Sequence, residues 1–126
     1  MEREIVATDK APTAVGPYSQ AVAVGQFVFT AGQLAIDPQT GQLIRGGIAE
    51  QTRQVLRNLA AVLEAADSSL DKVVKTTIFL SDMADFQNVN RVYEEFFPSA
   101  PPARSTIEVS RLPLEALIEI EAIAVK

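Results

Sequence analysis

The last segment of the chain, residues 117–125, alternates between two kinds of side chain with the two-residue period of a β-strand. One face of this segment is wholly apolar and consists of Ile118, Ile120, Ala122 and Ala124. The other face carries Glu119 and Glu121 among aliphatic neighbours. A carboxylate in such surroundings is costly unless a cation or hydrogen-bond donors meet it. The nearest upstream candidate is Arg104, so we expect Arg104 and these acids to form the core of a small-molecule site.

The remaining hydrophobic pattern predicts a chain of alternating strands and helices. Strands are predicted over 4–8, 21–24, 27–34, 73–80, 104–109 and 117–125, and helices over 48–66 and 85–97. The first helix has apolar residues at the 3.6-residue period, and Pro98 stops the second, for which Asp85 is the expected N-cap. Along 27–34, strict alternation places Gly32 on the same face as Val28.

This order of elements indicates one domain, residues 1–126, with a mixed sheet of about six strands. Right-handed crossovers in the same sense place both helices on one face of the sheet. The opposite face remains rich in Phe, Leu, Ile and Val, which water should not contact. We therefore expect that face to be buried against other copies of the chain in an obligate homo-oligomer.

Composition excludes several kinds of chemistry. The chain has no cysteine and no histidine, so thiol nucleophiles, imidazole bases and Cys/His zinc sites are impossible. The net charge of −5 argues against binding to nucleic acid or anionic membranes. No secretion signal and no membrane-length apolar run is present, and we expect a cytoplasmic protein. The aspartates lack calcium-loop spacing, and no phosphate-binding glycine motif occurs, so neither a metal nor an organic cofactor is expected.

Several runs, taken in order along almost the whole chain, resemble the Rid family, also called YjgF-type reactive-intermediate deaminases. These runs are G-P-Y-S-Q-A (16–21), T-A-G-Q (30–33), V-K-T-T-I-F-L (74–80), V-N-R-V-Y (89–93), P-P-A-R-S (101–105) and I-E-I-E-A-I-A-V (118–125). The combination of the Arg-Ser run, the closing strand and the Gly-Pro-Tyr loop is quite specific.

The resemblance implies an α+β, chorismate-mutase-like fold, a homotrimer and clefts between neighbouring subunits. It also implies hydrolysis of 2-imino acids, such as 2-iminobutanoate and 2-iminopropanoate, to 2-keto acids and ammonia. Matching the motifs places the substrate-carboxylate binder on Arg104 and the water-positioning acid on Glu119. The cleft residues then fall on Tyr18, Gly32 and Asn90.

The chain departs from the family pattern at two positions. Many relatives carry Cys where this chain has Thr106, and some carry Ser where it has Ala31. Thr106 alternates onto the same strand face as Arg104, so it is a candidate cleft residue, although a β-branched residue is equally a strand former. If a thiol or hydroxyl contributes at these positions in relatives, substrate preference or rate differs here.

Chemistry at these residues fits imine hydrolysis, but each has a structural alternative. The planar guanidinium of Arg104 suits a carboxylate, yet it could simply pair with Glu119 or Glu121 across the sheet. Glu121 points to the same side as Glu119, and only the family match favours Glu119. Tyr18 could instead pack into an interface as an aromatic side chain, and Asn90 could make a hydrogen bond from the helix to a loop.

Two further functions use the same residues or the same family. A module that binds a small 2-keto acid without turnover would need Arg104 but not Glu119. An RNA-cleaving activity is poorly supported, because the chain is acidic, lacks histidine and has no basic stripe.

Overall fold

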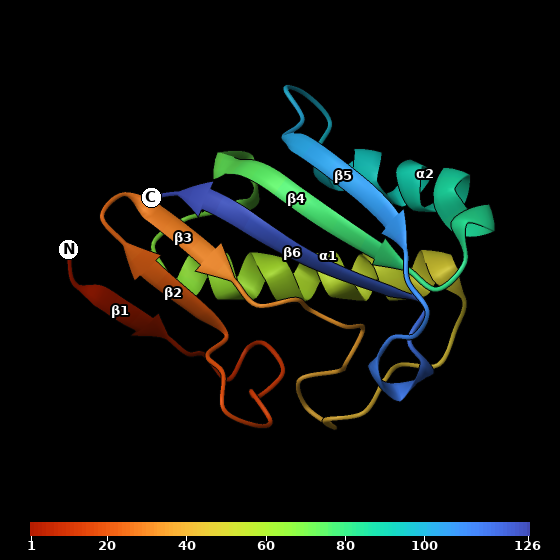
Figure 1. Ribbon diagram of the computed structural model, residues 1–126, viewed down its shortest axis with the longest axis horizontal. Helices are drawn as coiled ribbons and strands as arrows, with labels where there is room; N and C mark the ends of the chain where they lie inside the picture. Colours follow the sequence, from red (N-terminus) through yellow and green to blue (C-terminus); the bar gives the residue numbers. More distant parts are fainter.

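A computed structural model describes residues 1–126 and contains one six-stranded sheet with the order β1-β2-β3-β6-β4-β5 (Figure 1). The strands are β1 (Arg3–Val6), β2 (Ala21–Val24), β3 (Phe27–Thr30), β4 (Val73–Leu80), β5 (Ala103–Glu108) and β6 (Ile118–Val125), and the helices are α1 (Ile48–Ala65) and α2 (Phe86–Phe96). Neighbouring strands pair antiparallel except β4 and β5, which are parallel. Three short 3-10 turns complete the chain: η1 (Leu70–Lys72), η2 (Met83–Asp85) and η3 (Pro113–Glu115).

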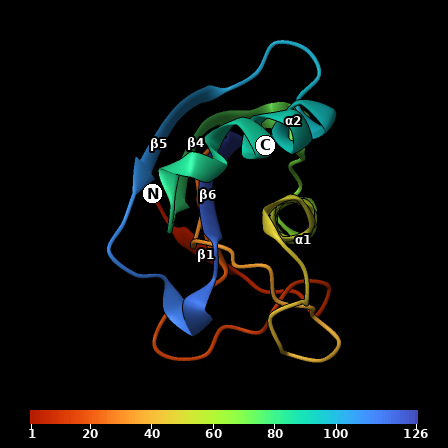
Figure 2. The ribbon, with the colours of Figure 1, turned by 90° about the vertical axis from the view of Figure 1, so that its right-hand side faces the viewer.

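Both helices pack on the same face of the sheet, as the sequence predicts (Figure 2). We call this side the helix face. The apolar side chains of β6 point toward it, and Ile118, Ile120 and Ala124 are completely buried there. The apolar stripe of α1 packs against them with Val55, Leu56, Leu59, Val62 and Leu63. The expected α+β fold, with a mixed sheet and two helices on one face, is confirmed.

The opposite side, the open face, exposes a continuous apolar surface. Ile5, Val22, Phe29 and Ile123 are successive cross-strand partners on β1, β2, β3 and β6. The exposed fractions are 60% for Ile5, 46% for Phe27 and 44% for Phe29. A single subunit therefore leaves several large apolar side chains in water. The homo-oligomer expected from the sequence would cover them, and it stays a prediction.

Strand β3 ends at Thr30 instead of continuing to residue 34, which corrects the sequence prediction. Phe29 lies opposite Ile123 and Gln33 lies opposite Ile120, so three residues between these pairs (30–32) face two on β6 (121–122). The extra residue is a bulge-like irregularity that reverses the alternation after Thr30. Gly32 consequently lies against Glu119 on the open face, and not with Val28 in the core.

Asp85 is the N-cap residue of α2, as the sequence predicts, but its side chain makes no capping hydrogen bond. The Asp82 carboxylate instead accepts one from the Ala84 backbone N–H (2.9 Å) in the preceding turn η2. Strand β1 stops at Val6 because the backbone of Thr8 instead bonds the Gln20 side chain, which accepts from the Thr8 N–H (2.6 Å) and donates to the Thr8 carbonyl (3.0 Å). No helix is both long and apolar enough to cross a membrane.

Candidate active site

Glu119 projects from β6 onto the open face and rests directly on Gly32. A Cβ atom placed on Gly32 would lie 2.0 Å from the Glu119 Oε2 atom, so only glycine allows this approach. The bulge after β3 creates the contact, since it turns residue 32 toward the open face. The group that approaches the Gly32 backbone this closely is the Glu119 carboxylate.

The surroundings of Glu119 favour its protonated form. Partial burial is the largest cause that raises the pKa of the Glu119 carboxyl, and the negative charge of Glu121 on the same strand face is the second. No cation of the same subunit offsets these effects, because the only salt bridges join Arg53 to Glu95 and Lys126 to Glu4. Glu119 is therefore poised to exchange a proton above the usual carboxyl range.

The carboxylate of Glu119 opens into a cavity of about 650 Å³, which we call the acid cavity. Tyr18, Gly32 and Ala31 line it with Glu119, together with apolar residues of the loops around it. Tyr18 is 54% exposed, and its hydroxyl accepts a hydrogen bond from the Val15 backbone N–H (3.3 Å). The structure thus brings Tyr18, Gly32 and Glu119 together in one cavity.

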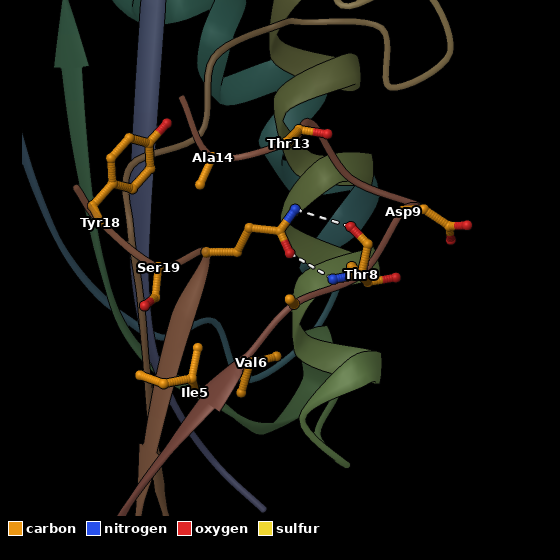
Figure 3. Close-up of a pocket in the computed structure, with 10 residues that line it drawn as sticks. Ile5, Val6, Thr8, Asp9, Thr13, Ala14, Tyr18 and Ser19 are labelled. Carbon is orange, nitrogen blue, oxygen red and sulfur yellow. Dashed lines mark hydrogen bonds between the residues drawn. The ribbon is translucent and has the colours of Figure 1, made fainter. Parts of the chain in front are cut away.

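A second hollow of about 470 Å³ adjoins the acid cavity and shares Tyr18 with it (Figure 3). Ile5 and Val6 of β1 form one side, and Thr8 and Asp9 lie across the view from Tyr18 (Figure 3). Gln20 is 4% exposed, and its bonds to the backbone around Thr8 fix the base of this loop. The Tyr18 ring is therefore carried by a well-anchored loop.

Arg104 lies on the helix face of the sheet, away from Glu119. It pairs in register with Thr76 of β4, which is completely buried beneath the helices. Glu119 pairs with Phe79 of the same strand and points to the open face. The structural alternative, in which Arg104 simply pairs with Glu119 or Glu121 across the sheet, therefore does not hold within the subunit: Arg104 has no salt bridge to either acid, because one strand presents successive residues to opposite faces.

The guanidinium of Arg104 instead lies over two aromatic rings of α2. Its Cζ atom is 5.4 Å from the centroid of the Phe86 ring and 5.0 Å from that of Tyr93. These distances fall within the range of cation–π attraction. The hydrophobic pattern alone predicts these rings as core residues of the helix, and it does not reveal their contact with Arg104. Their spacing of seven residues, with Asn90 between them, is the signal that could have revealed it.

Asn90 and Arg104 line a common cavity of about 460 Å³, which we call the arginine cavity. Tyr93, Phe97, Pro101 and Pro102 contribute to its wall. The Oδ1 atom of Asn90 is buried and has no hydrogen-bond partner in the subunit, so the alternative of a bond to a loop does not hold for this atom. Thr106 shares the strand face of Arg104, two residues further on, but does not line the cavity.

One subunit therefore carries two incomplete groups of the expected site residues. Tyr18, Gly32 and Glu119 surround the acid cavity, and Asn90 and Arg104 surround the arginine cavity. The sheet separates the two groups. No cluster of three or more His, Cys, Asp or Glu residues is arranged to hold a metal ion.

Comparison with known proteins assigns the chain to a family. The family model described as "Endoribonuclease L-PSP" matches residues 8–126. A RutC family protein of Pyrococcus abyssi is 53% identical over 100% of this chain and 99% of its own length. The human protein named 2-iminobutanoate/2-iminopropanoate deaminase is 46% identical over 98% of this chain and 90% of its own length.

Solved structures of related proteins also match this chain over nearly its whole length. A structure described as a putative endoribonuclease of Thermotoga maritima has a TM-score of 0.96 and 55% identity, and it covers 100% of this chain and 98% of its own. Escherichia coli TdcF with bound serine has a TM-score of 0.93 and 43% identity, with 98% of each chain covered. The chain therefore belongs to the endoribonuclease L-PSP family, which is the Rid family that its motifs resemble.

Proposed function

We propose that this protein hydrolyses small 2-imino acids in clefts between subunits of a homo-oligomer. The observation that carries the proposal is the separation of Glu119 and Arg104 onto opposite faces of one sheet, each in its own open cavity. If the acid cavity of one copy meets the arginine cavity of the next, a carboxylate anchor and an acid face each other. The exposed apolar face supplies the driving force for such an assembly, which we propose to be a trimer.

Each half would contribute one part of the reaction. The planar fork of Arg104 holds the substrate carboxylate, and it is free to do so because it has no carboxylate partner in its own subunit. Glu119 of the neighbouring copy orients a water molecule toward the C=N carbon and takes a proton from it as the C–O bond forms. The imine nitrogen gains a proton, and the C–N bond of the tetrahedral carbinolamine then breaks. Water is consumed, and a 2-keto acid and ammonia are released.

The remaining residues would shape the cleft around this chemistry. Gly32 allows the Glu119 carboxylate to lie close to the backbone, and Tyr18 lines one side of the acid cavity. Asn90 lines the arginine cavity beside Arg104, and its buried Oδ1 atom has no hydrogen-bond partner in the subunit. Thr106 is a less direct contributor, since it lies beyond the lining of the arginine cavity. Ala31 lines the acid cavity where some relatives carry serine, and it supplies no hydroxyl to the substrate.

Relatives support this choice of substrate. The human relative, which is 46% identical, is named 2-iminobutanoate/2-iminopropanoate deaminase. TdcF has been solved with bound serine, a small amino acid that carries a carboxylate. The family description mentions an endoribonuclease, but this chain has a net charge of −5 and no histidine, so RNA is not proposed as a substrate. A cytoplasmic location and the absence of a cofactor remain predictions.

The proposed function is tested with imino acids generated in situ by an amino-acid oxidase or a threonine dehydratase. The protein should accelerate loss of the imine. Arg104→Ala should lower kcat/KM by roughly a hundredfold, the cost of a lost charged hydrogen-bonding pair, while the oligomer stays intact. Arg104→Lys should also be poor, because an ammonium group does not reproduce the planar fork.

Equal decay of the imine with and without the protein would reject the enzyme. Calorimetry with 2-ketobutyrate on the wild type and on Glu119→Gln then separates the alternative functions. A binding module would take up 2-ketobutyrate and show no turnover with either protein.

Gly32→Ala tests the position of Glu119 without touching its chemistry. The new methyl group would occupy the place of the Oε2 atom, so the carboxylate must move by an ångström or more. A displacement of this size costs on the order of a hundredfold in rate. The fold should tolerate the change, since the clash is with the end of a flexible side chain. Gly47→Ala, where the nearest side-chain atom is 4.0 Å away, is the control. Full activity of Gly32→Ala would show that the reaction does not depend on the position of the Glu119 carboxylate.

Glu121→Gln tests which carboxylate reacts through the pH dependence of kcat/KM. The charge of Glu121 raises the pKa of Glu119, so its removal should lower that pKa. The ionised form of Glu119 then persists to lower pH, and the acid limb of the profile should shift downward while the maximum rate is retained. Glu119→Gln should abolish that maximum. The reverse pattern, with activity lost in Glu121→Gln and kept in Glu119→Gln, would assign the water to Glu121.

A further inference from the structure

The charge of Arg104 is partly buried without a counter-ion, which requires a physical explanation. Removing a guanidinium from water is costly unless another group compensates. A carboxylate partner would compensate, but it would also occupy the donors that a ligand needs. The two rings of α2, Phe86 and Tyr93, attract the cation through their faces and leave its N–H groups unpaired.

Tyr93 is itself held in place by the strand pair that carries Arg104. Its side chain is 5% exposed, and its hydroxyl shares a buried hydrogen bond of 2.7 Å with Thr76 Oγ1. Thr76 is the register partner of Arg104 on β4. Three contacts therefore join these residues in pairs. Arg104 pairs with Thr76 in the sheet, Thr76 hydrogen-bonds Tyr93, and the Tyr93 ring lies beside the Arg104 guanidinium. The centroid of the Phe97 ring lies 4.6 Å from that of Tyr93 and supports it from the other end of the helix.

Phe86 completes the arrangement from two helical turns earlier. Residues 86, 90 and 93 share one face of α2, so the Asn90 side chain lies between the two rings. Asn90 and Arg104 both line the arginine cavity, and the Arg104 guanidinium has no carboxylate partner there. The rings thus fix the direction of the cation beside this cavity.

We propose that Phe86 and Tyr93 are positioning residues that hold the Arg104 fork toward the substrate carboxylate, an inference that rests on the proposed function. The rings act through Arg104 and touch no reacting atom. The faces of the rings hold the guanidinium in place. The Tyr93 hydroxyl only fixes its own ring to Thr76. Because Arg104 anchors the carboxylate equally in the ground state and the transition state, loss of a ring raises KM and leaves kcat almost unchanged.

Four variants of the full-length protein separate the ring faces from general packing. Phe86→Leu and Tyr93→Leu remove one ring each. Tyr93→Phe combined with Thr76→Val keeps the ring and removes both hydroxyl partners together, so no buried polar group is left unpaired. Phe96→Leu is the matched control, since Phe96 is a half-buried residue of the same helix that makes no cation–π contact with Arg104.

The measurements are the KM and kcat for an imino acid generated in situ and the Kd for 2-ketobutyrate by calorimetry. Phe86→Leu and Tyr93→Leu should raise KM and Kd by about threefold to thirtyfold, the range of a cation–π contact. Phe96→Leu should stay within about twofold of the wild type, and the Thr76/Tyr93 double variant, which keeps the ring but releases it from β4, should raise KM and Kd less than Tyr93→Leu does.

Three results would overturn the inference. One is a rise in KM and Kd for Phe86→Leu that is no larger than the rise for Phe96→Leu. This comparison remains valid even if Tyr93→Leu fails to fold. Another is a fall in kcat at constant KM, the sign of a smaller fraction of folded protein. The third is a wild type that binds no 2-ketobutyrate. A wild type that binds 2-ketobutyrate but leaves imines unchanged would reject only the proposed enzyme, and the Kd values would still test the rings.

Discussion

The alternation of side chains along a β-strand is the constraint on which the rest of the molecule depends. Arg104 leaves β5 on the helix face, and Glu119 leaves β6 on the open face. No rotamer can bring the two together through a packed sheet whose inner side chains are completely buried. Each group therefore stands in its own cavity, and a joint role for them requires a second copy of the chain.

The same open face that carries Glu119 also explains why a second copy would bind. Ile5, Phe27 and Phe29 expose about half of their surface, and their strands form one continuous apolar row. Burial of such a surface favours association, because apolar area removed from water is stabilising in proportion to its size. Assembly and site formation would then depend on the same contact between subunits. A change that weakens the contact should affect activity and stability together.

Much of the architecture could be predicted from the sequence. Strand β4 and the buried face of β6 follow directly from hydrophobic alternation, and α1 follows from its 3.6-residue stripe. The end of β3 could not be predicted, since a one-residue bulge leaves no signature in the pattern of apolar residues. That bulge decides the face of Gly32, so strict alternation placed this residue wrongly.

The site residues were predicted mainly from family motifs and less from the hydrophobic and charge pattern of the chain. Five of the expected residues line the two cavities of the subunit. That Arg104 and Glu119 leave opposite faces of the sheet could not be predicted, because the register of β5 and β6 is not contained in the local pattern. The roles of Phe86 and Tyr93 were missed for a similar reason. A ring on an apolar helix stripe looks like core until the strand packed beside it is known to carry an arginine.

Mixing two inactive variants tests the shared site most directly. Arg104→Ala keeps an intact acid cavity, and Glu119→Gln keeps an intact arginine cavity. If each site joins one cavity from each of two copies, equal amounts of the two variants, refolded together, should regain about one quarter of wild-type activity, since a quarter of the clefts then contain both intact halves. No recovery, in a preparation that mass spectrometry shows to contain mixed oligomers, would contradict a site built from two subunits.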